Sequence, residues 1–372
     1  MANKVKVLIC SPKKNTGGIS MWTRYILDYF NTKGNDNIDV DWYYKDSTKD
    51  SLPNHSVIKR VFFGVMQYIP LVMGVKQQLK SQHYDILHIS SSASLGLMRD
   101  LWMLKICKRL KVKSVVHLHF GRIPAIFQSK GWEYKLLHKV ISHTTKVVVM
   151  DKASYNVLIE NGYRNIELLP NPLSPTILSL IDANNNVSRV DKKVVFAGHV
   201  VITKGIIELI EACKQIASTT EGFSLHILGH VREDMATVIQ TAAGENNENW
   251  LHVHGNQPID VVIREMRSAS VFALPTYTEG FPNVILESMA CGCSIVTTPV
   301  GAIPEMLAID SASPCGACIE VKNVVQLKDA IEKMLSNKDE AIKLGCAARQ
   351  RVIKEYSIDV VGTQLANIWK TI

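Results

Sequence analysis

The sequence has no uninterrupted apolar run long enough to cross a membrane. A bilayer span needs about 20 consecutive apolar residues, whereas the longest apolar stretch, VFFGVMQYIPLVMGV at 61–75, is shorter and contains Pro70. Basic residues bracket it, with Lys59 and Arg60 before it and Lys76 after it. Such a stretch either packs as a core helix or lies on a membrane surface as a basic, apolar helix, and the pattern leaves both alternatives open.

The sequence also lacks a disulfide framework. Its first residues, MANKVKVLIC, contain an apolar run too short for a signal peptide, so the eight cysteines indicate a reducing compartment. Cys315 and Cys318 have the spacing of a redox or metal-binding pair, but Cys291 and Cys293 do not form a second such pair. We therefore expect ordinary thiols and a cytoplasmic protein.

Acidic residues are scarce in the first half of the chain. Residues 1–171 contain 25 Lys and Arg against 12 Asp and Glu, a net +13, so the remainder carries −5 of the total +8. A basic half attracts phosphorylated substrates, anionic membranes or nucleic acid; a solvated basic surface is the alternative. Because no zinc finger, basic helix or aromatic RNA-binding motif accompanies the charge, we expect no nucleic-acid partner.

The length of 372 residues, without low-complexity tracts or internal repeats, predicts two globular domains. Short apolar runs alternate with amphipathic stretches, as in VKVLIC at 5–10 followed by SMWTRYILDYF at 20–30. This alternation is typical of parallel sheets covered by helices on both faces. A Pro-, Asn- and Ser-rich segment at 168–193 marks the boundary. We predict an α/β protein with two doubly wound domains, 1–172 and 173–354, facing a central cleft.

Gly17 and Gly18 lie between the first predicted strand and the first predicted helix. Glycine at this place lets the backbone approach a phosphate bound at the helix N-terminus. A plain turn explains the pair equally well.

The segment TEGFPNVILE places two acids around a turn that opens a helix. Pro282 suits an early helix position, so the amides of Phe281 and Asn283 are expected to face a ligand. Glu279 precedes this place and Glu287 follows it by about one helical turn. A carboxylate accepts hydrogen bonds from two adjacent hydroxyls, which predicts one acid for a hexose and one for a ribose. Alternatively, Glu279 is a solvent residue and Glu287 a partner of the helix dipole.

Together, EGFPNVILE and the following SMACGCSIVTTPVGAIPE resemble the E-x7-E signature and downstream Gly-x-x-x-Glu of retaining glycosyltransferases of family 4, which have the GT-B fold. Further pieces occur in the family's order: the Gly-Gly loop, VVHLHFG, FAGHVVITKG, LHILG and LHVHGNQP. The likeness extends through nearly the whole chain and is densest at 194–305. Residues 360–372 resemble the family's closing helix, so 355–372 are expected to join the first domain.

The resemblance implies roles for individual residues. Glu279 is expected to contact the donor sugar and Glu287 the ribose, while Lys204 matches a lysine that neutralises the donor diphosphate. A fixed cation there would stabilise the departing group. The expected catalytic residues are His119, Glu279 and Lys204, and the expected donor-binding residues are Gly17, Gly18, His199, Lys204, Gln257, Glu279, Gly280, Phe281, Pro282, Asn283 and Glu287.

Three histidines need separate interpretation. His199 stands where many relatives have an arginine; it is either a phosphate contact or a side chain packed at a strand end. His117 and His119 share one face of a predicted strand. His119 precedes Phe120-Gly121 and is therefore chosen as the family's active-site histidine, with His117 supporting it or packing below.

Two motifs that could suggest a metal are discounted. Asp39 and Asp41 form a D-x-D pattern, but strand alternation explains them better, and the family that the chain resembles needs no metal. His252 and His254 lack a third ligand in the sequence and are interpreted as strand residues. We expect no metal site and no separate cofactor.

The resulting expectation is a retaining, metal-independent glycosyltransferase of polysaccharide biosynthesis. It would move a hexose from a nucleotide-diphosphate sugar, with a UDP-sugar favoured over a GDP-sugar, to a glycan or a lipid-diphosphate-linked glycan. Its basic half and residues 59–83 suggest peripheral contact with an anionic membrane at the cytoplasmic face. The alternatives are a nucleotide-sugar epimerase or hydrolase of the same fold and a catalytically silent scaffold protein.

Overall fold

The computed structural model describes residues 4–14, 17–33, 37–45, 66–184, 186–245 and 247–372. Contacts divide the chain into a first unit, Met1–Pro172 with Ile358–Ile372, and a second unit, Leu173–Ser357. Residues 59–65, at the start of the basic apolar stretch, lie outside the described residues. Among the described residues, no helix combines the length and the apolar character needed to cross a membrane.

The first unit is built on a parallel six-stranded sheet in the order β2-β1-β3-β4-β5-β6. Alternate residues of its strands enter two separate apolar cores, one on each face of the sheet. The strands are β1 (Val5–Cys10), β2 (Ile38–Trp42), β3 (Ile86–Ser91), β4 (Lys113–Leu118), β5 (Lys146–Val149) and β6 (Ile166–Leu168).

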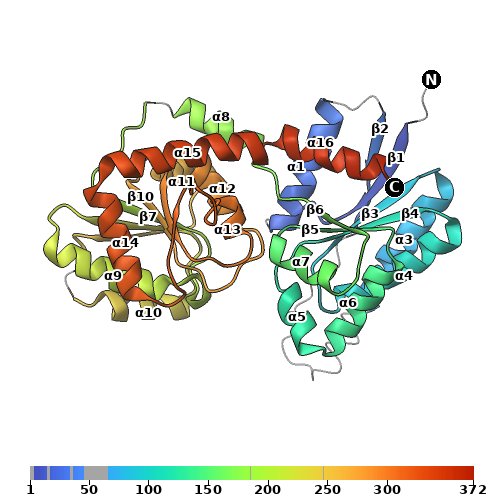
Figure 1. Cartoon of the computed structure of the whole chain (residues 1–372), viewed down its shortest axis with the longest axis horizontal. Helices are drawn as coiled ribbons and strands as arrows, with labels where there is room; N and C mark the ends of the chain where they lie inside the picture. The colour runs from blue at the N-terminus through green and yellow to red at the C-terminus, as the bar shows by residue number, and fades with distance from the viewer. Residues whose placement is uncertain (1–3, 15–16, 34–36, 46–65, 185, 246) are drawn as a thin grey trace. The chain divides into compact units, whose positions relative to one another are not determined.

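Helices cover both faces of this sheet (Figure 1). One face packs against α1 (Gly18–Thr32) and α16 (Ile358–Lys370), which contribute Trp22, Ile26, Leu365 and Trp369 to the core. The other face packs against helices that follow the strands in the chain: α3 (Tyr68–Ser81), α4 (Gly96–Leu110), α5 (Ile123–Ser129), α6 (Trp132–His143) and α7 (Lys152–Glu160).

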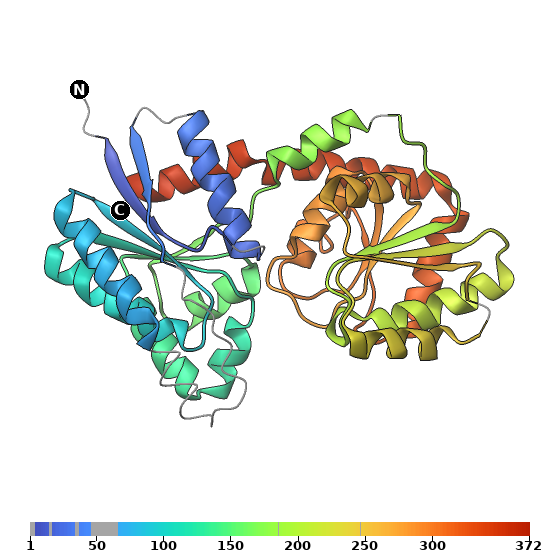
Figure 2. The same ribbon diagram turned by 180° about the vertical axis from the view of Figure 1, so that it is seen from behind.

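The second unit repeats this construction with a parallel sheet in the order β12-β11-β10-β7-β8-β9. Its strands are β7 (Lys193–Ala197), β8 (Ser224–Leu228), β9 (Leu251–Gly255), β10 (Val271–Leu274), β11 (Ser294–Thr297) and β12 (Ala317–Cys318). Figure 2 shows the sheet between two helical layers. These contain α8 (Pro175–Ala183), α9 (Ile206–Thr219), α10 (Glu233–Ala243), α11 (Ile259–Ser268), α12 (Asn283–Ala290), α14 (Val324–Ser336) and α15 (Lys338–Tyr356), with the short η1 (Ile202–Lys204) and α13 (Ile303–Met306) at loops.

Both sheets reverse the direction in which strands are added, and these points place the candidate sites. In the first unit β2 and β3 lie on opposite sides of β1, and in the second unit β8 and β10 lie on opposite sides of β7. At such a reversal the two loops that leave the carboxyl ends of the strands diverge, which creates a place for a ligand. The predicted pair of doubly wound parallel sheets is confirmed.

The C-terminal helix α16 is attached to the first unit through a buried polar contact. Trp369 is 1% exposed, and its indole N–H donates to Nδ1 of His88 at 3.1 Å. Trp369 also packs against Phe30 of α1, with ring centroids 5.1 Å apart. On the surface, Lys33 pairs with Asp359 at 2.6 Å. The last residues of the chain therefore complete the core of a sheet that the first residues begin.

We predict that Trp369→Phe lowers the free energy of unfolding of the first unit by about 1–3 kcal/mol, because Nδ1 of His88 then remains buried without a donor. Urea denaturation followed by circular dichroism measures the loss. Trp132→Phe is the matched control, since Trp132 is 57% exposed. An equal loss in both variants would contradict the assigned contact.

Candidate functional site

The predicted lysine and the first predicted acid form an ion pair at the strand-order reversal of the second unit. Lys204 ends η1 in the loop after β7, and Glu279 lies in the loop after β10. Their ammonium and carboxylate groups are hydrogen-bonded and are 24% and 11% exposed. Glu279 is therefore not the solvent residue of the alternative interpretation. The sequence had assigned these two charges to different parts of a ligand, and the structure shows them in contact.

Backbone packing holds the two loops together. Gly205 has φ +69°, and a Cβ atom at this position would lie 2.0 Å from the carbonyl oxygen of Pro275. The Tyr277 N–H donates to the Thr203 carbonyl at 2.8 Å. Because only glycine permits this approach, Gly205 determines how close Lys204 comes to the loop that carries Glu279.

The second half of the Glu279 loop rests on Gly301, whose φ is +58°. A Cβ atom there would lie 2.5 Å from the carbonyl oxygen of Glu279, and the Ala302 N–H donates to the Gly280 carbonyl at 2.9 Å. The loop downstream of β11 thus supports the expected donor-binding turn. The close approach explains why the Gly-x-x-x-Glu pattern has glycine at position 301.

The turn that opens α12 differs in one respect from the prediction. Pro282 is the N-cap residue and Asn283 the first helical residue, so Pro282 does not occupy an early position inside the helix. No side chain caps the N-terminus of α12, and its first turn contains no acidic residue. Within the described part of the chain, the Phe281 N–H has no hydrogen-bond acceptor. The Phe281 ring packs 6.0 Å from that of Tyr356. This helix end can accept an anion or a hydroxyl oxygen.

Glu287, the second predicted acid, is the fifth residue of α12. Burial alone raises its pKa from 4.5 to about 7, and its carboxyl group has no hydrogen-bond or ion-pair partner in the described residues. The influence of a helix dipole falls off within the first turn, so the alternative role as a dipole partner does not fit. A partly exposed acceptor without a protein donor is suited to binding hydroxyl groups.

Two other expected donor residues lie on loops at the same edge of the sheet. His199 is exposed in the loop after β7, which rules out the alternative that it packs at the strand end. Gln257 follows β9, and its side-chain amide donates to the His254 carbonyl at 2.7 Å. The Gln257 side chain therefore stabilises the 256–258 turn.

In the first unit, Gly17 and Gly18 lie at the N-terminus of α1, in the loop after β1. Gly17 is the N-cap residue with an extended backbone, and no atom lies within 4 Å of the place where a Cβ would stand. The first turn carries neither a capping side chain nor an acid. The helix end is open to a ligand, although neither steric crowding nor backbone strain requires glycine at Gly17.

His119 follows β4 and belongs to a cluster of aromatic rings on the face covered by α1. Its ring lies 3.8 Å from that of His117 and 5.1 Å from that of Trp22. Burial, with a smaller contribution from His88, lowers the pKa of His119 to about 3, so its imidazole is neutral at pH 7. His117 is fully buried beneath it, as the second alternative predicted.

The sequence analysis missed Trp22 and His88 as members of this cluster. Trp22 stacks on His88 with centroids 5.3 Å apart, and a histidine inside the apolar strand DILHIS was the only local signal. Several buried ring nitrogens in the described residues have no hydrogen-bond partner: Trp22 Nε1, His88 Nε2, His117 Nδ1 and Nε2, and His119 Nε2. A neutral His119 whose Nε2 has no partner among the described residues therefore lies in a desolvated environment.

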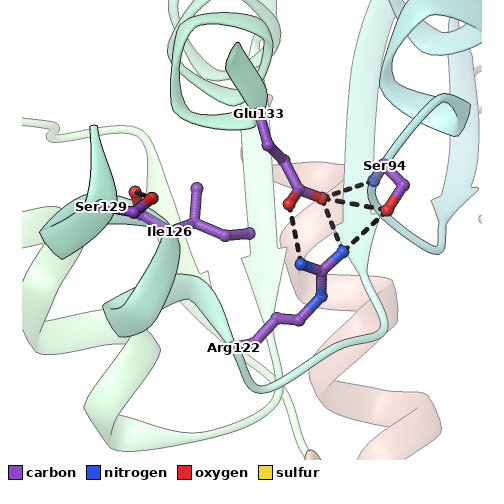
Figure 3. Close-up of polar contacts among 5 residues, drawn as sticks. All are labelled: Ser94, Arg122, Ile126, Ser129 and Glu133. Atoms are coloured by element: carbon purple, nitrogen blue, oxygen red, sulfur yellow. Dashed lines mark hydrogen bonds and ion pairs between the residues drawn. The ribbon is translucent and has the colours of Figure 1, made fainter. Parts of the chain in front are cut away.

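An ion pair next to His119 fixes the adjacent loops, and this too was missed (Figure 3). Arg122 donates to both carboxylate oxygens of Glu133, at 2.6 and 2.7 Å. The same carboxylate accepts the backbone N–H of Ser94 at 2.7 Å. Ala93 and Ser94 both have positive φ, 70° and 53°, a conformation that costs energy in non-glycine residues. Glu133 thus holds the loop after β3 in place.

The discounted motifs have two different outcomes. Asp41 lies in β2 and accepts a hydrogen bond from Tyr84 at 2.8 Å, which supports a structural role for the D-x-D pattern. Burial raises the pKa of the Cys315 and Cys318 thiols to about 11 and about 12. His252 and His254 lie in β9 as expected, and His226 and Glu265 lie close to His254, with one potential ligand atom from each within 4.8 Å of the others.

We predict that Glu287→Gln becomes more stabilising as the pH rises. A carboxyl group whose pKa is raised by folding contributes stability below its unfolded pKa, and this contribution is lost as the pH passes through about 7. The variant should match wild type in urea denaturation at about pH 4, below the unfolded pKa, and exceed it at about pH 8. The exposed Glu248→Gln variant controls for loss of a surface charge. A difference that does not vary with pH would contradict the desolvation that raises the pKa of Glu287.

Comparison with solved structures places this fold. A sucrose-phosphate synthase from Thermosynechococcus elongatus superposes with a TM-score of 0.74 at 15% identity, covering 99% of each chain. The Anabaena protein HepE in complex with UDP superposes with a TM-score of 0.72 at 16% identity, covering 99% of this chain and 100% of HepE. At such low identity these likenesses show the fold, which is GT-B.

Curated relatives are glycosyltransferases. An uncharacterized glycosyltransferase of Methanocaldococcus jannaschii is 24% identical over 82% of this chain and 81% of its own length. The capsular polysaccharide biosynthesis glycosyltransferase CapM of Staphylococcus aureus is 24% identical over 65% of this chain and 60% of its own length. Residues 180–351 match the family described as "Glycosyl transferases group 1". The chain therefore has the GT-B fold, and its second unit is similar to the group 1 glycosyltransferases.

Proposed function

We propose that the protein is a retaining, metal-independent hexosyltransferase that uses a nucleotide-diphosphate sugar as donor. The acceptor in this proposal is a hydroxyl of a glycan or lipid-diphosphate-linked glycan in polysaccharide biosynthesis. The observation that carries the proposal is the Lys204–Glu279 ion pair, because it places a fixed cation and an acid together at the strand-order reversal. Such a place binds nucleotides in doubly wound folds.

In this proposal Lys204 stabilises the departing diphosphate, and Glu279 orients Lys204 and binds the sugar. Transfer breaks the bond between the sugar and a nucleoside diphosphate, so negative charge grows on the diphosphate. The Lys204 ammonium stabilises this charge and is already oriented by Glu279 before the donor binds. The other lone pairs of the Glu279 carboxylate accept hydrogen bonds from the sugar. The Phe281 N–H next to it offers a donor for a phosphate or hydroxyl oxygen.

Glu287 is proposed to bind the ribose. Two vicinal hydroxyls would supply hydrogen bonds that its half-buried carboxyl group does not receive from the described residues, and binding would favour the ionised form. The 256–258 turn, stabilised by Gln257, is proposed to lie near the base. The UDP bound to the structural neighbour HepE supports a uridine nucleotide, although that protein shares 16% of its sequence with this chain.

In the first unit, His119 is proposed to contact the reacting sugar. With its pKa near 3, the ring is neutral and acts through a hydrogen bond, not as a proton donor. In a retaining transfer the departing phosphate then takes the proton of the acceptor hydroxyl on the same face of the sugar. The new glycosidic bond forms as the sugar–phosphate bond breaks.

The acceptor class is supported by relatives and by one surface of the first unit. CapM and the amylovoran biosynthesis protein AmsK of Erwinia amylovora are named for polysaccharide assembly.

An apolar stripe lies on and next to α3. Its residues lie on one face and are partly exposed: Met66 (46%), Ile69 (40%) and Met73 (55%). This apolar stripe belongs to the basic half of the chain, which suits peripheral contact with an anionic membrane at the cytoplasmic face.

We predict that UDP-sugars raise the melting temperature of the wild type and that Glu287→Ala abolishes this shift. A parallel panel of GDP- and ADP-sugars identifies the base.

Lys204→Ala should reduce kcat/KM by about 10²–10³-fold, since it removes a charge that acts mainly as the leaving group departs. Lys214→Ala, which removes an exposed lysine of α9, is the matched control.

The products decide between the alternatives. Transfer to an acceptor with the anomeric configuration kept supports the proposal. Sugar released rapidly to water, or isomerised without an acceptor, would indicate a hydrolase or an epimerase. If no nucleotide series binds the wild type, the chain is a silent scaffold and the donor-site assignment fails.

We further predict that the protein floats with anionic vesicles and that the double variant Ile69→Ser, Met73→Ser floats less. Flotation should also decline with added salt, because screening weakens the attraction of the basic half to the lipid surface. Val325→Ser, at a side chain of the second unit that is 65% exposed, controls for a general loss of surface apolarity. Binding that ignores lipid charge, salt and the α3 variant would exclude this surface.

A further inference from the structure

Side chains from three elements of the second unit converge in a group that includes neither Lys204 nor Glu279. His226 lies in β8, His254 in the neighbouring edge strand β9, and Glu265 in α11. The Nδ1 atom of His226 lies 3.0 Å from Nε2 of His254 and 3.4 Å from Oε2 of Glu265. One ligand atom from each residue lies within 4.8 Å of the others. The group is partly open to solvent, because His254 is exposed.

Two of these separations, from His226 to His254 and from His226 to Glu265, are close to those in the coordination shell of a small transition-metal ion. Zn²⁺ binds imidazole nitrogens and carboxylate oxygens at about 2.0–2.2 Å with tetrahedral geometry, so neighbouring ligand atoms lie about 3.3–3.5 Å apart. The two short distances around His226 are close to this value. Two imidazoles and one carboxylate form an established type of zinc ligand set, with a fourth position left for water.

The irregular pairing of β8 and β9 explains how the two histidines meet. His226 pairs with His252, but the register shifts after Ile227, so that Leu228 pairs with Gly255. His254 is the extra residue of this irregularity, and its ring stacks at 5.1 Å on that of His226. Bulges of this kind commonly re-aim a side chain. Glu265 then approaches from the helix that covers the same face.

The surroundings keep the ligands available. Lys193 donates to Glu265 at 2.7 Å and also to Ser268 at 2.7 Å. A carboxylate has several lone pairs, so Glu265 can hold Lys193 and a metal together. The ring of His252, 4.7 Å from that of His226, borders the site.

We propose that His226, His254 and Glu265 form a binding site for one transition-metal dication of the Zn²⁺ type. The bound ion links the edge strand β9 to β8 and α11 and stabilises the second unit. It takes no part in sugar transfer, and the proposal is independent of the proposed donor and acceptor. The sequence offered no spacing signal for this site, because its three ligands are 28 and 11 residues apart in the chain.

The test is a competition titration of the purified, chelator-treated chain with Zn²⁺ against a chromophoric chelator. The titration uses a Cys346→Ser background, because Cys346 is an exposed thiol that would compete for the metal. We expect one equivalent to bind and to raise the melting temperature. His254→Ala and Glu265→Gln should each weaken binding by at least about tenfold and reduce the shift in melting temperature.

His254→Ala is the decisive variant because this side chain is exposed and its loss should leave the fold intact. Glu265→Gln keeps an oxygen that can accept from Lys193. His143→Ala is the matched control and should bind Zn²⁺ like the parent, because His143 is an exposed histidine of α6 whose Nδ1 lies 2.8 Å from the Lys139 carbonyl of the same helix. Equal affinity in the His254→Ala variant and the parent, or no stoichiometric binding by the parent, would overturn the proposal.

Discussion

The candidate donor site depends on the close approach of two backbone segments at Gly205 and Pro275. The loop after β7 can pass this strand end only because residue 205 has no side chain. That passage brings the Lys204 ammonium to the Glu279 carboxylate, and Gly301 supports the other side of the Glu279 loop in the same way. Gly205 and Gly301, which both have positive φ, therefore determine where the charges of Lys204 and Glu279 lie. A charge held in place before a ligand binds needs little reorganisation during a reaction.

Both units place partly unsatisfied polar groups in desolvated surroundings. In the second unit the half-buried carboxyl of Glu287 has no donor in the described part of the chain, and desolvation raises its pKa. In the first unit the rings around His119 include nitrogens without partners. Such groups raise the free energy of the empty protein, and the cost falls when a polar ligand supplies the missing hydrogen bonds. Stability and ligand binding are thus in competition at these two places.

The histidines of the chain show how differently one residue type is used. His88 accepts a hydrogen bond from Trp369 and so helps to fix α16 to the first sheet. His119 is kept neutral by burial among other rings. His226 and His254 meet because the edge strand is irregular. In each case the neighbours from other elements, and not the local sequence, determine what the imidazole can do.

The sequence by itself determined the alternation of strands and helices, the break between two sheets and the segment with two acids, because these depend on local periodicity and on spacing within one turn and helix. It also indicated Lys204 through its resemblance to a family. Only the tertiary structure decided that Lys204 pairs with Glu279, that Glu287 titrates near pH 7, and that His226, His254 and Glu265 converge. These features depend on contacts between residues far apart in the chain and on the removal of water, and neither leaves a pattern in the order of the amino acids.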